Sequence, residues 1–307
     1  MTSRRSFIKN TGISSLVFST GAIPFSKLLP QEISRLTILH TNDVHSRIEP
    51  FPDDGSRNAG AGGAVRRAKL IEKIRQENKN VLLLDAGDIF QGTPYFNFYG
   101  GELEMKLMSS MGYDAATIGN HDFDAGIEGL EKQLIHADFP LIISNYDFSK
   151  SIMAGKTIPR MIKEYEDLRI GITGVGIELA GLVPEVLYKE TRYLNPIKHA
   201  QEQAHILKHD EKCDFVICLS HLGYKYQNNT VSDMVLAMDT EDIDLIIGGH
   251  THTFMRRPDI TRNLKGKKVI VNQAGWAGIM LGRLDITFEK NKKGNCITCS
   301  NTLITDS

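Results

Sequence analysis

Short apolar runs alternate along the chain with longer segments in which apolar residues recur every three or four positions. Residues 36–40, 81–85 and 215–219 form apolar runs typical of buried strands. Residues 102–111 and 196–210 have helical spacing instead. This alternation predicts an α/β fold. Further strands are expected at 115–119, 141–143, 170–173, 244–247, 268–271 and 281–288, and further helices at 67–75 and 127–135.

Side chains of the types that bind transition metals follow several of these expected strands, at their carboxyl ends. Open α/β sheets build their sites at that edge, so we expect these side chains to converge. In extended chain, positions two apart face the same way, so Asp43 and His45 would point to one side, as would His250 and His252. The candidate ligands are Asp43, His45, Asp88, Asn120, His221, His250 and His252.

Seven ligands of this kind can bind two metal ions that share one carboxylate. Asp88 is the natural bridge, because a carboxylate has two oxygens to divide between two ions. Two dications carry +4 and two carboxylates remove two charges, so a net charge of +2 remains. That excess lowers the pKa of a bridging water from 15.7 to about 7 and attracts a phosphate dianion. Mixed His, Asn and carboxylate ligation suits Zn, Mn, Fe or Co.

The order of these motifs resembles that of the calcineurin-like metallophosphoesterases. The motifs are Asp-x-His at 43–45, Gly-Asp at 87–88, Gly-Asn-His-Asp at 119–122, the single His221, and Gly-His-x-His at 249–252. The exact residues of these motifs are similar to those of the 5′-nucleotidase/UDP-sugar hydrolase branch. The chain matches the catalytic domain of that branch over residues 35–290. The resemblance implies a four-layer α/β/β/α sandwich of two mixed sheets, the metallo-dependent phosphatase-like fold.

The resemblance also implies a role for each site residue. One ion would be held by Asp43, His45, Asp88 and His252, and the other by Asp88, Asn120, His221 and His250. His121 would not bind metal but would donate to the phosphoryl group or the leaving oxygen. Asp124 would hold the His121 imidazole, although Asp122 and Asp124 could also simply cap the helix expected at 127–135. A metal-bridging hydroxide would attack phosphorus in line.

The function expected from this set is an exported dinuclear-metal hydrolase of phosphate monoesters, 5′-nucleotidase-like. One alternative is a related phosphodiester, pyrophosphate or thiosulfonate hydrolase. The other is a non-catalytic metal-bearing subunit completed by a separately encoded nucleotide-binding domain. Family members carry a second domain that grips phosphate and stacks on the base, and the sequence ends where that domain would begin, so nucleotide specificity is not implied. Trp276 could offer a stacking surface or pack on the surface.

The amino terminus resembles a twin-arginine export signal. Arg4 and Arg5 precede a mildly apolar stretch at 12–25, which is shorter than the roughly 20 residues of a membrane span. We therefore expect export to the periplasm or cell envelope and no integral membrane span. The expected organisation is a signal at 1–30, a metallophosphoesterase domain at 35–290, and a tail at 291–307 that is an edge strand or a loose end.

Composition narrows the possible partners. A net charge of −1 and a pI near 6.8 provide no electrostatic footprint for a nucleic acid polymer or an anionic membrane, so a small-molecule phosphoester is expected. The glycine order at 171–176 does not match a dinucleotide fingerprint, so no such cofactor is expected.

Two smaller groups of residues have plain interpretations. Cys218 is expected to be a buried thiol, whereas Cys296 and Cys299 could form a local disulfide or, with Cys213 and Cys218, a zinc site. His205 and His209 are one helical turn apart and could chelate a metal ion. A solvated helix face is the favoured interpretation, because charged residues surround them.

Overall fold

Two mixed β-sheets form the centre of the computed structural model, which describes residues 33–228, 230–289 and 295–305. The expected export signal lies outside these residues. The first sheet has the strand order β13-β12-β1-β2-β3. In chain order its strands are β1 (Ile33–Thr41), β2 (Val81–Asp85), β3 (Ala115–Ala116), β12 (Met280–Glu289) and β13 (Asn295–Leu303). Strands β1, β2 and β3 are parallel, while β12 and β13 are antiparallel additions.

The second sheet has the strand order β10-β11-β9-β8-β6-β5. Its inner strands β11, β9, β8 and β6 are parallel, and its two edge strands are antiparallel to their neighbours. The strands are β5 (Arg160–Tyr165), β6 (Leu168–Val175), β8 (Phe215–Ser220), β9 (Leu245–Gly248), β10 (Asp259–Arg262) and β11 (Lys268–Asn272), and a separate small ribbon pairs β4 (Tyr146–Asp147) with β7 (Arg192–Tyr193).

Alternate residues of the central strands enter different apolar cores, which explains why the runs are apolar throughout. Ile38 and Leu84 join a core between the two sheets, together with Ile217 and Ile247 of the second sheet. Leu39 lies on the opposite face of β1 and joins a core beneath the helices. Both faces of the central strands are therefore buried, as continuous hydrophobic runs require.

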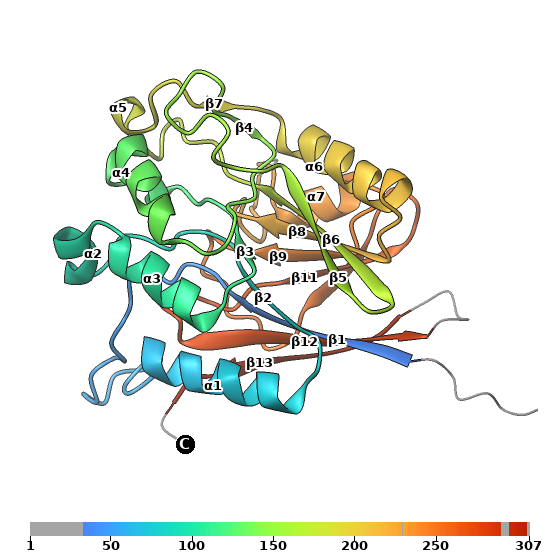
Figure 1. The fold of residues 1–307 in the computed structure, drawn as a ribbon, viewed down its shortest axis with the longest axis horizontal. Helices are drawn as coiled ribbons and strands as arrows, with labels where there is room; N and C mark the ends of the chain where they lie inside the picture. Colours follow the sequence, from blue (N-terminus) through green and yellow to red (C-terminus); the bar gives the residue numbers. More distant parts are fainter. Residues whose placement is uncertain (1–32, 229, 290–294, 306–307) are drawn as a thin grey trace, which may run out of the picture. The chain divides into compact units, whose positions relative to one another are not determined.

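Helices cover the outer face of each sheet. Helices α1 (Ala64–Glu77), α3 (Glu102–Met111) and α4 (Gly126–Gln133) contribute to the core on the first sheet, and α6 (Pro196–His205) and α7 (Asp233–Asp239) to the core on the second. Figure 1 shows α1 and α6 on opposite sides of the strands. The predicted four-layer sandwich is confirmed. The remaining short helices are α2 (Pro94–Tyr99), α5 (Glu185–Tyr188), the 3-10 turns η1 (His121–Phe123) and η2 (Leu134–His136), and the π-helical turn η3 (Ile206–Asp210).

Two expected strands are largely wrong. The strand expected at 115–119 ends at Ala116. Residues 141–143 form only isolated bridges, to Ala116 on one side and to Ile158 on the other: Ile142 N donates to Ala116 O (2.8 Å), and Ile143 N donates to Ile158 O (3.0 Å).

The remaining expectations concern the tail, the cysteines and membrane spans. Strand β13 is an edge strand paired with β12, one of the two forms expected for the tail. Cys213 and Cys218 are buried free thiols, and burial raises the pKa of both. The side chains of Cys296 and Cys299 lie outside the described residues. Within the described parts of the chain, no helix has both the length and the apolar character needed to cross a membrane.

The core between the sheets supplies the first prediction. Leu284 of β12 is completely buried there, so Leu284→Ala should lower the free energy of unfolding by about 2–5 kcal/mol through the cavity it leaves. Leu264 is 64% exposed, and the matched Leu264→Ala change should alter it by less than about 0.5 kcal/mol. Urea unfolding of both variants at one fixed metal concentration measures the difference. Equal losses would contradict the assigned core.

Candidate metal centre

The predicted ligands meet where the carboxyl ends of strands from both sheets come together. Strand β1 leads to Asp43 and His45, β2 to Asp88, and β3 to Asn120. In the second sheet, β8 leads to His221 and β9 leads to His250 and His252. All seven side chains predicted from the sequence are brought together.

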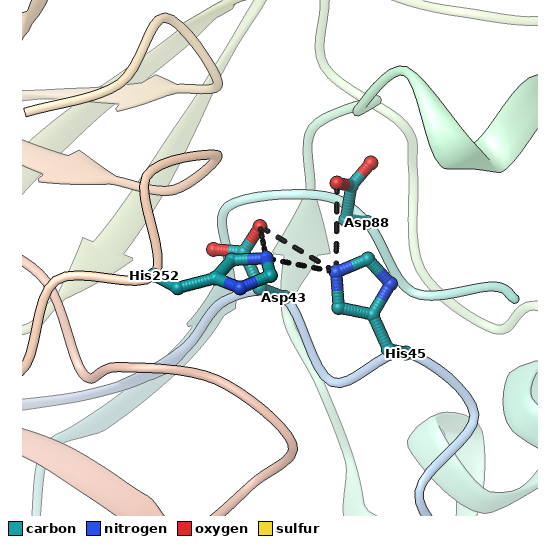
Figure 2. A group of neighbouring side chains, drawn as sticks. All are labelled: Asp43, His45, Asp88 and His252. Atoms are coloured by element: carbon teal, nitrogen blue, oxygen red, sulfur yellow. Dashed lines mark hydrogen bonds and ion pairs between the residues drawn. The ribbon is translucent and has the colours of Figure 1, made fainter. Parts of the chain in front are cut away.

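The first cluster consists of Asp43, His45, Asp88 and His252, whose side chains Figure 2 shows pointing toward one another. The Nε2 atoms of His45 and His252 are 3.0 Å apart, and His252 Nε2 lies 3.4 Å from Asp43 Oδ1. Ligand atoms bound to one ion at about 2.0–2.1 Å lie roughly 3.0–3.4 Å from one another. These separations therefore fit a shared cation.

The second cluster consists of Asp88, His221 and His250, with Asn120 beside them. Asp88 Oδ2 lies 3.1 Å from His221 Nε2, and Asn120 Oδ1 lies 2.9 Å from His250 Nδ1. The same Asp88 oxygen lies 3.7 Å from His45 Nε2 in the first cluster. The other oxygen, Oδ1, accepts the backbone N–H of His121 at 2.8 Å. In the structure Asp88 therefore faces both clusters through Oδ2, while Oδ1 is held by a backbone N–H.

Two of the imidazole rings, those of His221 and His45, have Nδ1 beside a backbone carbonyl and Nε2 turned to the clusters. His221 Nδ1 is 2.7 Å from Ala86 O, which assigns the proton to Nδ1. Its Nε2 is buried and has no hydrogen-bond partner. Similarly, His45 Nδ1 faces Phe90 O at 3.3 Å. A carbonyl behind an imidazole is the usual support of a metal-binding histidine, so the rings fit a metal site.

The electrostatics of the buried pair Asp88 and His221 also call for positive charge. Burial raises the pKa of Asp88, but His221 and His45 outweigh burial and hold it below its ordinary value. Burial lowers the pKa of His221, but Asp88 outweighs burial and raises it to about 10. The site thus stabilises a cation next to Asp88, either a proton or a metal ion.

Five of the seven ligands have left-handed backbone conformations, which non-glycine residues rarely adopt. Their φ angles are 51° for Asp43, 51° for His45, 56° for Asp88, 69° for His250 and 52° for His252. The expectation that these pairs lie in extended chain is therefore wrong. Tight turns, not strand alternation, aim the side chains. Such conformations cost about 1–3 kcal/mol each and persist only where surrounding contacts enforce them.

Asp122 is a supporting residue whose role was not predicted. Its carboxylate accepts the backbone N–H groups of Ile89 (2.8 Å) and Gly119 (2.7 Å), along with those of Asp88 and Phe90. It therefore fixes the turn that carries Asp88 and does not cap the following helix. A Cβ at Gly119 would collide with Asp88, so glycine is required at this close approach.

Gln273 and Asn42 hold the opposite side of the centre and were also missed. Gln273 donates to Gly249 O (2.8 Å) and accepts the N–H of Thr253 (3.1 Å), which clamps the turn bearing His250 and His252. Asn42 donates to Asp43 Oδ2 at 2.6 Å. The single sequence signal for Asn42 is its place beside Asp43. Gln273 offers no signal, because its partners are 20 or more residues away.

His121 lies at the edge of the centre and not within either cluster. Its Nδ1 is 2.9 Å from Asp124 Oδ2, and Asp124 makes no capping hydrogen bond to α4. The contact raises the pKa of His121 above 6.5, although burial opposes it. His121 lines a cavity of about 220 Å³ together with His45, His252 and Trp276. The arrangement places a titratable imidazole beside the clustered ligands.

Trp276 was expected either to offer a stacking surface or to pack on the protein surface, and it takes part in both. Its ring stacks on the His252 imidazole with centroids 5.7 Å apart and planes 8° from parallel. One face of the indole is thus occupied by a candidate ligand, while the side chain still borders the cavity.

Comparison with known proteins agrees with this geometry. Residues 36–254 match the calcineurin-like phosphoesterase family. The snake venom 5′-nucleotidase of Gloydius brevicauda is 35% identical over 94% of this chain and 51% of its own length. A 5′-nucleotidase precursor from Thermus thermophilus aligns with a TM-score of 0.79 at 30% identity, covering 89% of this chain and 55% of that one.

A further solved relative is the NAD nucleotidase of Haemophilus influenzae, with a TM-score of 0.77, 28% identity, and coverage of 89% of this chain and 50% of that one. The chain spans about half the length of the relatives it matches. The matched residues include β2 and β3 with most of β1 in the first sheet, and β5, β6, β8 and β9 in the second, and they contain all seven clustered ligands. The chain belongs to the calcineurin-like phosphoesterase family.

Proposed function

We propose that the protein hydrolyses phosphate monoesters, 5′-nucleotides foremost, with two divalent ions bound at the clustered side chains. The observation that carries this proposal is the position of Asp88, whose Oδ2 faces His221 in one cluster and His45 in the other. Two sites that share a carboxylate are the arrangement that phosphoryl-transfer chemistry uses to stabilise attacking and leaving oxygens. The 5′-nucleotidase relatives support the same substrate class.

The residues divide into two proposed ligand sets. The first is Asp43, His45, Asp88 and His252, and the second is Asp88, Asn120, His221 and His250. When bound, the divalent ions supply Lewis acidity and lower the pKa of water from 15.7 to about 7. With two carboxylates against two dications the centre retains positive charge, which favours a phosphate dianion in the adjoining cavity.

His121 is the proposed proton donor to the phosphoryl group or leaving oxygen. Asp124 accepts from Nδ1, so the proton available to substrate is on Nε2. The carboxylate also favours the protonated imidazole, as the raised pKa of His121 indicates. Asp124 is therefore a positioning residue, which sets the ring orientation and the tautomer.

His121→Asn should lower kcat for AMP by about 10²- to 10⁴-fold, because it removes the proton donor but none of the proposed ligands. Metal content, measured by elemental analysis, should stay at the wild-type value. His199 lies on α6 and pairs with Glu202, so His199→Asn is the matched control and should keep full turnover. Loss of metal in His121→Asn would show that His121 is a ligand and not the donor.

Removal of the ions by dialysis against a chelator should abolish AMP hydrolysis, and Zn, Mn, Fe or Co should restore it to different degrees. Phosphate release from AMP and p-nitrophenyl phosphate measures monoesterase activity. Bis-p-nitrophenyl phosphate, UDP-glucose and a protein-bound thiosulfonate test the related hydrolases. Full turnover by protein shown to be metal-free would exclude the proposed mechanism.

Selectivity among nucleotides is proposed to depend on residues beyond the ligands. A separately encoded nucleotide-binding domain could supply them, and activity that arises only on mixing with such a protein would support this version. A metal-bearing subunit without catalysis would bind ions yet release no phosphate from any of these substrates, with or without that protein.

We also propose export by the twin-arginine route to the periplasm or cell envelope, on the basis of Arg4 and Arg5. The double substitution Arg4→Lys/Arg5→Lys should retain the protein in the cytoplasm of a bacterial host with this pathway, measured by fractionation and immunoblotting. The matched control, Arg256→Lys/Arg257→Lys, changes a second arginine pair elsewhere in the chain and should be exported like the wild type. Unchanged export of the Arg4→Lys/Arg5→Lys variant would refute this route.

A further inference from the structure

A second group of potential metal ligands lies at the end of α6, away from the centre already described. His205 is the last residue of α6, and His209 lies in the π-helical turn that continues it. Asp242 precedes β9, at the end of that strand opposite to His250. Their ligand atoms all lie within 4.8 Å of one another. The sequence favoured a solvated helix face, and both rings are exposed as that interpretation predicts, but the structure adds the Asp242 carboxylate beside them.

Asp242 is buried, although both histidines are exposed. Its side chain is 1% exposed, compared with 58% for His205 and 46% for His209. Gln201 Nε2 donates to Oδ2 at 3.4 Å, but Oδ1 is buried without a hydrogen bond of normal geometry. A buried carboxylate oxygen left in this state costs free energy unless a cation lies against it.

The distances fit a shared ion. Asp242 Oδ2 lies 3.4 Å from His205 Nδ1, and Oδ1 lies 3.1 Å from His209 Nε2. A hydrogen bond between a charged imidazole and a carboxylate is shorter, about 2.7–2.9 Å. Ligand atoms around a tetrahedral zinc ion lie roughly 3.3 Å apart, because each bond is about 2.0–2.1 Å long. The 3.4 Å separation matches the second value, and the 3.1 Å separation lies midway between the two.

We infer that His205, His209 and Asp242 form a peripheral site for Zn²⁺ or a similar transition-metal ion. Two imidazoles and one carboxylate are a common zinc ligand set, and the exposed side of the rings leaves a fourth position for water. A bound ion would join the end of α6 to the segment that enters β9 and so stabilise the outer layer of the second sheet.

The test compares bound zinc in the full-length protein and the double variant His205→Ala/His209→Ala. Both proteins are dialysed against the same low-micromolar Zn²⁺, and bound zinc is measured by elemental analysis. The wild type should retain one more ion per chain. The ligands of the metal centre are intact in both proteins. The difference in bound zinc therefore reports the peripheral site, whatever number of ions the centre holds. Hydrolysis of p-nitrophenyl phosphate should be equal in the two proteins.

His199→Ala is the matched control, because His199 lies on the same helix but outside the cluster, and it should bind as much zinc as the wild type. Thermal unfolding provides a second measurement. With the catalytic centre already saturated with Mn²⁺, added Zn²⁺ should raise the Tm of the wild type more than that of the double variant. Equal zinc content and equal Tm shifts in the two proteins would overturn the inference.

Discussion

The burial of two carboxylates, Asp43 and Asp88, at the meeting point of two sheets is the constraint on which the rest of the structure depends. Neither side chain is more than 2% exposed, so each needs positive charge or hydrogen-bond donors beside it. His221 and His45 contact Asp88, while the N–H of His250 points at Asp43. The fold thus gathers polar groups from distant parts of the chain around two negative charges.

The strain in the five left-handed ligand positions explains the dense support around them. Asp122 holds the turn that carries Asp88 by accepting backbone N–H groups. On the side of the second sheet, Gln273 holds the turn that carries His252. Asp233 in turn accepts from Gln273 at 3.0 Å, and burial raises the pKa of this aspartate to about 7. A rigid site is therefore built from supports that are themselves polar and buried.

Much of the fold and the ligand set could be predicted, because apolar runs and the polar residues after them are local features of the sequence. The supports could not, since Gln273 and Asp122 act on backbone groups far along the chain. The prediction of an extended backbone at these ligands was wrong for the same reason. Contacts across the fold, and not local preference, hold Asp43 at a positive φ. The spacing of His205 and His209 was visible, but the position of Asp242 depends on tertiary packing.

The stacking of Trp276 on His252 gives the molecule an internal optical reporter. Trp276 is the single tryptophan of the chain, so all indole emission originates beside one candidate ligand. Cation binding at His252 changes the charge facing the excited ring, and a cation near an indole face interacts with its π-electrons. Occupancy of the first cluster can therefore be followed by intrinsic fluorescence, without a label or a substrate.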